Sequence, residues 1–271
     1  MMPAQDLTAR QLLDFYLEAG ADALVGEEAV DRFAATDEPA PVRVTRAPLP
    51  ATATADSLRP LPAIQQAAPQ ATDDAIMSAR EAARGANSLD ELRALLDKFE
   101  GCALKGSATR MVFADGNPEA RVMLVGEAPG RDEDIEGLPF VGRSGKLLDR
   151  MLAAIGLDRT SVYIANIVPW RPPGNRTPTP QETQICLPFV LRQIELADPD
   201  ILICLGGPSA QTLLGIKDGI TKTRGRWFTF NSGKRDIRAI ATFHPAFLLR
   251  SPLQKRFAWR DLLSVKKALA E

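Results

Sequence analysis

Several features are scarce or missing in this sequence of 271 residues, and each absence narrows the possibilities. Its three cysteines are an odd number, which does not suggest an extracellular disulfide framework. No uninterrupted apolar run approaches the roughly 18 residues of a membrane-spanning helix. The start, Met-Met-Pro-Ala-Gln-Asp, lacks a basic region leading into an apolar one, so no secretory signal is visible. We therefore expect a cytoplasmic protein with no membrane partner.

Charge is unevenly divided along the chain. Residues 1–100 contain 9 Lys+Arg and 17 Asp+Glu, a net charge of −8, whereas residues 101–271 contain 24 and 17, a net charge of +7. A basic carboxy-terminal part suits a polyanionic ligand such as DNA. An excess of this size is also compatible with an ordinary solvated surface.

The chain is predicted to have three parts. Apolar side chains at helical spacing make residues 1–33 an amphipathic helical segment, which we expect to dock or to bind a protein partner. Residues 34–72 are rich in Ala and Pro without a sustained period, which indicates a disordered linker. Residues 73–271 are predicted to form the main domain. Its helical lead-in, 73–98, contains a second helix that begins with a Ser88–Glu91 capping box.

Strand and helix patterns alternate through the main domain. Strands are expected at 121–126, 162–167, 200–205 and 237–243, and helices at about 144–155, 180–196, 208–214 and 253–269. This alternation predicts a three-layer α/β/α sandwich with a central, mostly parallel four-stranded sheet. Because parallel strands end at one edge, four separated positions are expected to converge there: Glu127, Asn166, Gly206 and His244.

A dinucleotide-binding sheet is the rival interpretation of this alternation. Such a sheet carries Gly-x-Gly-x-x-Gly after its first strand, and this chain has Gly126-Glu127-Ala128-Pro129-Gly130 there instead. The missing motif counts strongly against that rival. A loop this rich in glycine, followed by Asp132-Glu133-Asp134, is instead typical of a site, because glycine lets the backbone approach a ligand closely.

A second constellation, Thr242–Arg250, surrounds the only histidine, His244. Together with the glycine-rich loop it resembles the family 4 uracil-DNA glycosylases over about residues 99–267. Further motifs match in the family's order and spacing: Gly137-Leu-Pro-Phe-Val-Gly142, Tyr163-Ile-Ala-Asn166, Arg171-Pro-Pro-Gly-Asn-Arg176, Leu205-Gly206 and Arg224-Gly225.

The resemblance implies a monofunctional uracil-DNA glycosylase of base excision repair, a monomer acting on uracil-containing DNA, either single- or double-stranded. Such an enzyme hydrolyses the N-glycosidic bond of deoxyuridine, releases uracil and leaves an abasic site, and it needs no metal for the chemistry. The alternative is a non-catalytic relative that binds uracil or damaged DNA and recruits a partner. Glu127, Phe140, Asn166 and His244 are all present, which favours the enzyme. A third class, a nucleotide-binding regulator, is disfavoured because the phosphate loop is missing.

The family pattern implies a role for each pocket residue. Phe140 is expected to stack on the extracted base. The Asn166 carboxamide would accept from uracil N3–H and donate to O4, whereas cytosine presents the opposite pattern. Gly126 and Ala128 complete the expected uracil-binding set. His244 would donate to uracil O2, where charge develops as the bond breaks.

A carboxylate is expected to activate water and to stabilise the sugar cation. Glu127 fits this role best, and Glu133 is a second catalytic candidate. Asp132 and Asp134 lie nearby, and the sequence leaves open which of these four carboxylates faces the sugar. For Asp134 a solvated surface position is an equal alternative.

DNA contacts are expected from two segments. One leucine of the pair Leu248 and Leu249 should pack against the body while the other acts as an apolar wedge, with Arg250 and Ser251 meeting phosphate. The loop carrying Arg171 and Arg176 offers a second backbone contact, with a rigid turn as the alternative interpretation.

The chain departs from the family at its iron–sulfur cluster. Most members hold a 4Fe-4S cluster with four cysteines, of which this chain keeps Cys102 and Cys186. Phe99 and Trp170 stand at the other two positions, and neither can ligate iron. Cys204 lies inside a predicted strand and is expected to pack as a small hydrophobe. We therefore expect no cofactor, with the two aromatic side chains filling the cluster's volume.

Overall fold

A computed structural model describes residues 69–270 of the chain. The predicted segment 1–33 and nearly all of the predicted linker 34–72 lie outside the described residues. The expected lead-in is present as two helices, α2 (Pro69–Gly85) and α3 (Leu89–Lys98). At the start of α3 the Ser88 hydroxyl accepts from the Glu91 amide at 3.2 Å. The Glu91 carboxylate accepts from the Asn87 amide at 2.7 Å, so the reciprocal bond reaches one residue further back than in an ideal capping box.

The four predicted parallel strands are present, as β2 (Val122–Gly126), β3 (Tyr163–Asn166), β4 (Ile201–Leu205) and β6 (Asp236–Thr242). The prediction of a four-stranded sheet was wrong in number, because the sheet has six strands in the order β1-β3-β2-β4-β6-β5. The two additions are antiparallel edges, β1 (Asp115–Gly116) on β3 and β5 (Trp227–Asn231) on β6. With two residues, β1 is too short to show an alternating pattern.

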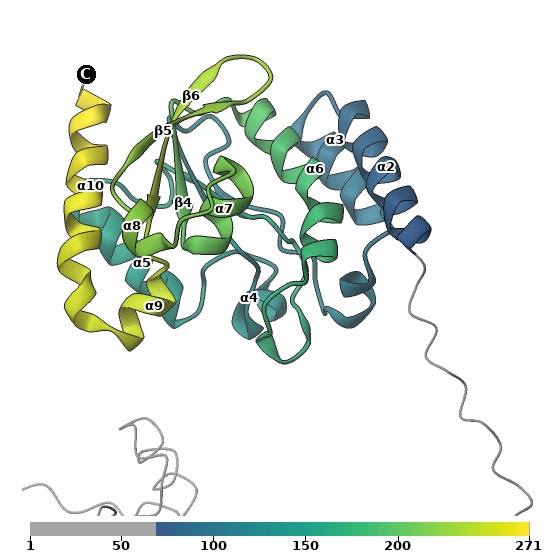
Figure 1. The fold of residues 1–271 in the computed structure, drawn as a ribbon, viewed down its shortest axis with the longest axis horizontal. Helices are drawn as coiled ribbons and strands as arrows, with labels where there is room; N and C mark the ends of the chain where they lie inside the picture. The colour runs from purple at the N-terminus through teal and green to yellow at the C-terminus, as the bar shows by residue number, and fades with distance from the viewer. Residues whose placement is uncertain (1–68, 271) are drawn as a thin grey trace, which may run out of the picture. The chain divides into compact units, whose positions relative to one another are not determined.

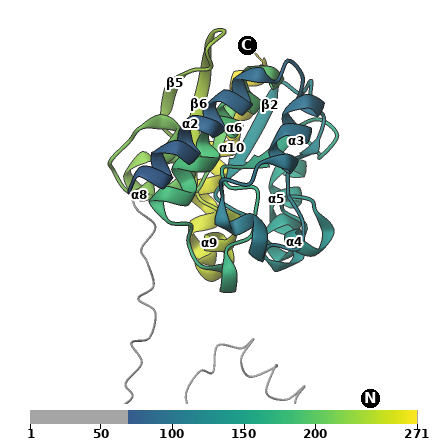
Figure 2. The same cartoon turned by 90° about the vertical axis from the view of Figure 1, so that its right-hand side faces the viewer.

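Helices cover both faces of the sheet, which confirms the three-layer α/β/α arrangement (Figures 1 and 2). Met123 and Val125 of β2 pack on one face with apolar residues of α3, α6 (Pro180–Ala197) and α7 (Gly207–Leu214). Val122 and Leu124 pack on the other with α5 (Arg143–Ala154) and α10 (Lys255–Ala270). Successive strand residues are therefore all buried, which explains why the strands are continuous apolar runs in the sequence.

The connections bring several helix starts to the carboxyl edge of the sheet. The short helices α4 (Arg131–Glu136) and α9 (Pro245–Arg250) follow β2 and β6, and α7 follows β4 directly. The chain passes from β2 to β3 on one side and then to β4 on the other, which makes the carboxyl ends of β2 and β4 the switch point where such sheets bind ligands. The remaining short helices are η1 (Ala103–Ser107), η2 (Pro173–Asn175), α8 (Ile220–Thr223) and η3 (Pro252–Gln254). Within residues 69–270, no helix combines the length and apolarity that crossing a membrane requires.

Candidate active site

A cavity of about 640 Å³ lies at the carboxyl edge of the sheet. Its lining comes from the segments that follow all four parallel strands, as the sequence predicted for this edge. The predicted site residues among those that line it are Glu127, Ala128, Glu133, Phe140, Asn166, Arg176, His244 and Arg250.

Gly126, the last residue of β2, lies between two of the predicted uracil-binding side chains. A Cβ at this position would overlap Asn166 Oδ1 and would lie 2.7 Å from Phe140 Cζ. No side chain larger than hydrogen fits without moving them. These two side chains therefore approach the Gly126 backbone closely, and the role of Gly126 in binding uracil stays a prediction.

Asn166 ends β3 beside Gly126 and is only 5% exposed. Its Oδ1 is the one buried side-chain polar atom within residues 69–270 that has no hydrogen-bond partner. Leaving such an acceptor unpaired costs about 1–3 kcal/mol. An unpaired acceptor beside a cavity is the arrangement that a ligand N–H donor would satisfy.

Phe140 and His244 are neighbours in the wall of the cavity. Their ring centroids are 5.4 Å apart, and the ring planes are tilted by 32°. Phe140 follows Pro139 on the loop between α4 and α5, and its φ of 55° lies in the left-handed region that favours glycine. The aromatic ring is thus held in place at the expense of backbone strain.

His244 is the N-cap of α9, and this position determines which of its ring nitrogens carries the proton. Its Nδ1 accepts from the Ala246 amide at 3.1 Å, so the neutral ring carries its proton on Nε2. Burial, followed by the nearby charge of Arg250, lowers the pKa of His244 to about 4. At neutral pH the residue is therefore an uncharged imidazole whose Nε2–H is a hydrogen-bond donor.

Glu127 is the first residue after β2, and it is partly exposed on the cavity wall. In the described part of the chain no donor bonds its carboxylate, and desolvation raises the pKa of Glu127 above its ordinary value. A partly buried carboxylate free of protein partners is available for water or substrate.

The other carboxylates are bound to the protein backbone or lie away from the cavity. Glu133 Oε2 accepts from the Gly130 amide at 3.1 Å, and Oε1 accepts from the amides of Val141 and Gly142 at 3.1 and 3.0 Å. Asp134 is buried, not solvated, and its Oδ1 accepts from the amides of Thr109 and Arg110 at 2.8 and 3.2 Å. Asp132 is exposed and does not line the cavity.

The predicted leucine pair beyond His244 divides between packing and partial exposure. Leu248 is 1% exposed and packs with Phe243 and Ala258, as expected for one member of the pair. Leu249 and Ser251 are partly exposed, and Arg250 is exposed beside the cavity. Leu253 was not among the predicted DNA contacts, and it is 83% exposed in η3 (Pro252–Gln254). Its only signal in the sequence is an apolar residue after a proline at a helix end.

The two predicted arginines of the loop after β3 are both held by protein partners. Arg176 lines the cavity and donates to both Glu182 oxygens, at 2.7 and 2.8 Å. Arg171 donates to Asn175 Oδ1 at 2.6 Å and does not line the cavity. These bonds fix the conformation of the loop that follows β3. The two guanidinium groups remain at least partly exposed.

The two remaining family cysteines are buried together, away from the cavity. The Cys186 thiol donates to Cys102 Sγ at 3.9 Å, which lowers the pKa of Cys102. Phe99 and Trp170 belong to the same apolar cluster, and Trp170 is 2% exposed. Nowhere in residues 69–270 do three or more His, Cys, Asp or Glu side chains form a group that could hold a metal. Cys204 is buried in β4, where desolvation raises its pKa to about 12 and makes it an inert packing residue.

The amino-acid sequence of this chain is similar to a known protein family and to several individual proteins. The family described as the Uracil DNA glycosylase superfamily matches residues 113–263. The chain is 41% identical over 169 residues to a type-4 uracil-DNA glycosylase of Archaeoglobus fulgidus, covering 61% of this chain and 85% of that protein. It is 44% identical over 155 residues to the Thermotoga maritima protein of the same name, covering 57% and 79%. A third, from Saccharolobus solfataricus, is 40% identical over 189 residues, covering 68% and 88%.

Proposed function

Because the chain belongs to the uracil-DNA glycosylase superfamily, and within it to the type-4 proteins, we propose that it excises uracil from DNA. The reaction is hydrolysis of the N-glycosidic bond of deoxyuridine, which leaves an abasic site for base excision repair. One observation carries the proposal most directly: Asn166 Oδ1 is buried without a partner beside a cavity that Phe140 and His244 also line.

Recognition of the base rests on the Asn166 carboxamide. Its Oδ1 accepts from uracil N3–H and its amide donates to O4, while Phe140 stacks on the ring. Cytosine offers an acceptor at N3 and a donor at its amino group, so it would leave buried polar groups unpaired. Each such group costs about 1–3 kcal/mol, which makes the rejection strong.

His244 stabilises the leaving group. As the N1–C1′ glycosidic bond breaks, its electron pair stays on uracil N1 and is delocalised onto O2. A neutral imidazole that donates from Nε2 to O2 strengthens its bond as that charge grows. The low pKa of His244 keeps the ring uncharged, so it acts as a hydrogen-bond donor and does not protonate the base.

Glu127 serves the sugar side of the reaction. Among residues 69–270 its carboxylate has no partner, so it orients or deprotonates the attacking water and stabilises the developing oxocarbenium ion. Glu133 was a second candidate, but three backbone amides already occupy its two oxygens. We therefore assign water activation to Glu127 and a positioning role to Glu133.

DNA binds at the rim of the cavity. Arg250 and Ser251 meet phosphate near the flipped nucleotide, and Arg171 and Arg176 provide a second contact to the DNA backbone. Leu249 remains the wedge candidate of the predicted pair, since Leu248 is packed in the core. That the protein acts on uracil-containing DNA, either single- or double-stranded, and that it acts as a monomer, stay predictions.

The family's iron–sulfur cluster does not fit the residues present here. A 4Fe-4S cluster needs four thiolates, and Phe99 and Trp170 stand at two of the four positions. Phe99 packs edge-on against Phe189 with centroids 5.1 Å apart, and a Cβ at Gly101 would overlap its ring. We propose that these aromatics replace the cluster by apolar packing. Stoichiometric iron and acid-labile sulfide in anaerobically purified protein would contradict this proposal.

Residues 1–72 are proposed to be peripheral to excision, because every residue assigned to the reaction lies beyond them. Removing them should change single-turnover excision by less than about tenfold. A larger loss in a truncated protein that keeps its fold would mean that this part belongs to the catalytic unit. Residues 1–33 would then serve both catalysis and the predicted protein partner.

The direct test of the function uses an oligonucleotide with one uracil, followed by alkali cleavage at abasic sites. Wild-type protein should cut at uracil, and a matched oligonucleotide with cytosine or thymine should remain intact. Glu127→Gln should lose most of the activity while still binding the uracil strand. Selective binding without cleavage by the wild-type protein would instead support the non-catalytic alternative.

A further inference from the structure

Phe140, the proposed stacking residue, has a backbone conformation that is unfavourable for a residue other than glycine. Phe140 has a φ of 55°, which lies in the left-handed region where a non-glycine residue is strained. Such a residue stays in place only when its neighbours hold it. The contacts of the loop around Phe140 show what those neighbours are.

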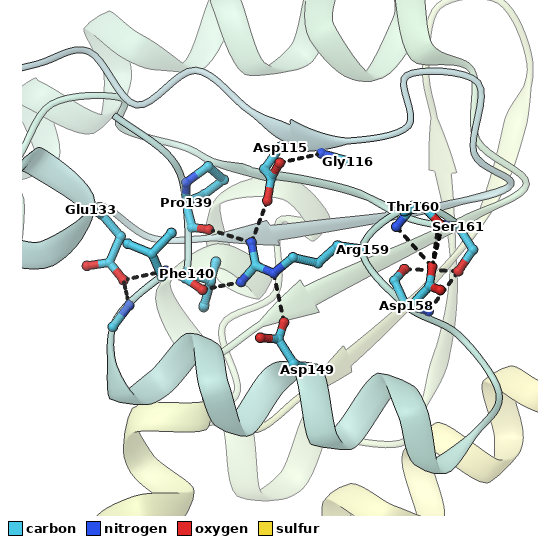
Figure 3. Close-up of polar contacts among 12 residues, drawn as sticks. Asp115, Gly116, Glu133, Pro139, Phe140, Asp149, Asp158, Arg159, Thr160 and Ser161 are labelled. Atoms are coloured by element: carbon cyan, nitrogen blue, oxygen red, sulfur yellow. Dashed lines mark hydrogen bonds and ion pairs between the residues drawn. The ribbon is translucent and has the colours of Figure 1, made fainter. Parts of the chain in front are cut away.

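Arg159 binds the carbonyl side of this loop (Figure 3). It lies between α5 and β3, and its guanidinium donates to two successive backbone carbonyls. Nη1 bonds the Pro139 oxygen at 3.1 Å, and Nη2 bonds the Phe140 oxygen. These are the two carbonyls on either side of the strained φ and ψ angles, so Arg159 fixes the orientation of the peptide that carries the ring.

Two carboxylates hold Arg159 in turn. Nη1 lies 2.5 Å from Asp115 Oδ2 on β1, and Nε lies 2.8 Å from Asp149 Oδ1 on α5. The Arg159 side chain is about a quarter exposed, so these ion pairs alone contribute little to stability. Their effect is geometric, because a planar guanidinium held at both edges can present its donors in only one direction.

The other side of the loop is held as well. Glu133 accepts from the amides of Val141 and Gly142, which directly follow Phe140. At the first turn of α5, a Cβ on Gly145 would overlap the Phe140 carbonyl, so the helix approaches the loop as closely as glycine allows. An arginine thus binds the carbonyls and a glutamate binds the amides of one four-residue segment.

We infer that Arg159 is a positioning residue for uracil recognition, which fixes the strained Phe140 backbone so that the aromatic ring stands ready to stack on the base. Asp115 and Asp149 set the direction of its guanidinium. The inference rests on the proposed function for the identity of the base. Preorganisation of the ring before the base arrives would lower the entropy lost on binding.

The chain offers a matched control in Arg235. This arginine also pairs with two aspartates, Asp198 at 2.7 Å and Asp200 at 3.1 Å, and it also donates to two backbone carbonyls. It precedes β6, at the edge of the sheet opposite the cavity. Arg235→Met should therefore report what the loss of such a network does to the fold alone.

The experiment compares wild-type protein with Arg159→Met, Arg159→Lys and Arg235→Met. Amide hydrogen exchange over residues 138–145 measures the hold on the loop, and inhibition by free uracil measures the stacking site. In Arg159→Met, exchange should be about tenfold or more faster and uracil inhibition about tenfold weaker. Arg159→Lys should recover part of both, whereas Arg235→Met should match wild type in both even if its Tm falls.

Two results would overturn the inference. If the amides of residues 138–145 exchange in Arg159→Met at the wild-type rate, the loop keeps its conformation without Arg159. If exchange is faster but uracil inhibition and the single-turnover rate are unchanged, the bonds from Arg159 to the loop do not affect binding of the base. If the wild-type protein neither excises nor binds uracil, the proposed function fails, and the exchange measurement still decides whether Arg159 fixes Phe140.

Discussion

Two regions of this molecule correspond to functional parts of its family, and they are built in opposite ways. The cavity at the carboxyl edge keeps a buried acceptor without a partner on Asn166 and a strained backbone at Phe140. The region around Cys102 and Cys186 is packed with aromatic side chains. Strain and unpaired atoms are concentrated in the first region, and close apolar packing characterises the second.

If the proposed function is correct, the first region is a site that binds a base, and the second is one in which apolar packing takes the place of a cluster. An unpaired buried acceptor lowers stability unless a ligand supplies the donor. Aromatic side chains that fill a volume raise stability without any ligand. Substitutions in the cavity should therefore affect turnover more than folding, and substitutions near the cysteines should do the reverse.

The largest loss of turnover is expected from Asn166→Asp. An ionised carboxylate replaces the donor to uracil O4 by an acceptor, so single-turnover excision of uracil should fall by roughly 10³-fold or more. Residual excision of cytosine should rise relative to that of uracil. Asn117→Asp, on an exposed turn, is the matched control and should behave as wild type. Uracil excision within tenfold of wild type would remove Asn166 from base recognition.

A smaller loss is expected from His244→Ala. Removing one donor to a developing anion typically slows the chemical step by about 10²-fold or more. Affinity for uracil-containing DNA should change much less, because the donor acts mainly in the transition state. Single-turnover cleavage measured beside equilibrium binding separates the two effects. Cleavage at the wild-type rate would exclude the leaving-group role.

The pH dependence should report Glu127 and not His244. Glu127 works as a carboxylate and its pKa is raised, so the rate should rise with pH and level off above that raised pKa. The pKa of His244 is about 4, so its ring stays neutral across the neutral range and adds no further rise. Single-turnover rates from about pH 4 to 8 test this, and Glu127→Gln should abolish the rise. A second rise near pH 6.5, the ordinary histidine pKa, would contradict it.

The smallest effect on turnover is expected from Trp170→Ala, at the packed region. Truncating a buried tryptophan should lower the free energy of unfolding by about 3–5 kcal/mol. Residual folded protein should keep nearly normal single-turnover excision at low temperature. Denaturant unfolding together with activity measures both. A large loss of chemistry without a loss of stability would mean that this region still serves the reaction.

The sequence predicted the central fold because burial on both faces leaves a plain signal. Strands such as Ile201–Leu205 are continuous apolar runs, and parallel strands bring their carboxyl ends to one edge. Glu127, Asn166 and His244 could therefore be grouped correctly. The edge strands were missed, because β1 has two residues and β5 carries no strict alternation of buried and exposed positions.

Other parts of the site depend on where side chains point, which the sequence does not record. Glu127 and Glu133 look equivalent in the acidic loop, and only the three amide bonds to Glu133 separate them. Arg159 was missed because its role comes from Asp115, which lies 44 residues away in the chain. Contacts of this range become visible only in three dimensions.

The unpartnered oxygen of Asn166 also bears on resistance to heat. Because this unpaired atom costs about 1–3 kcal/mol, we expect the free protein to melt at a lower temperature than it would if the atom were paired. An apolar side chain of similar shape, such as leucine, should relieve that loss and raise the Tm, and it should abolish the proposed recognition of the base. At position 166, thermal stability would therefore favour an apolar side chain, and the proposed recognition of the base requires a polar one.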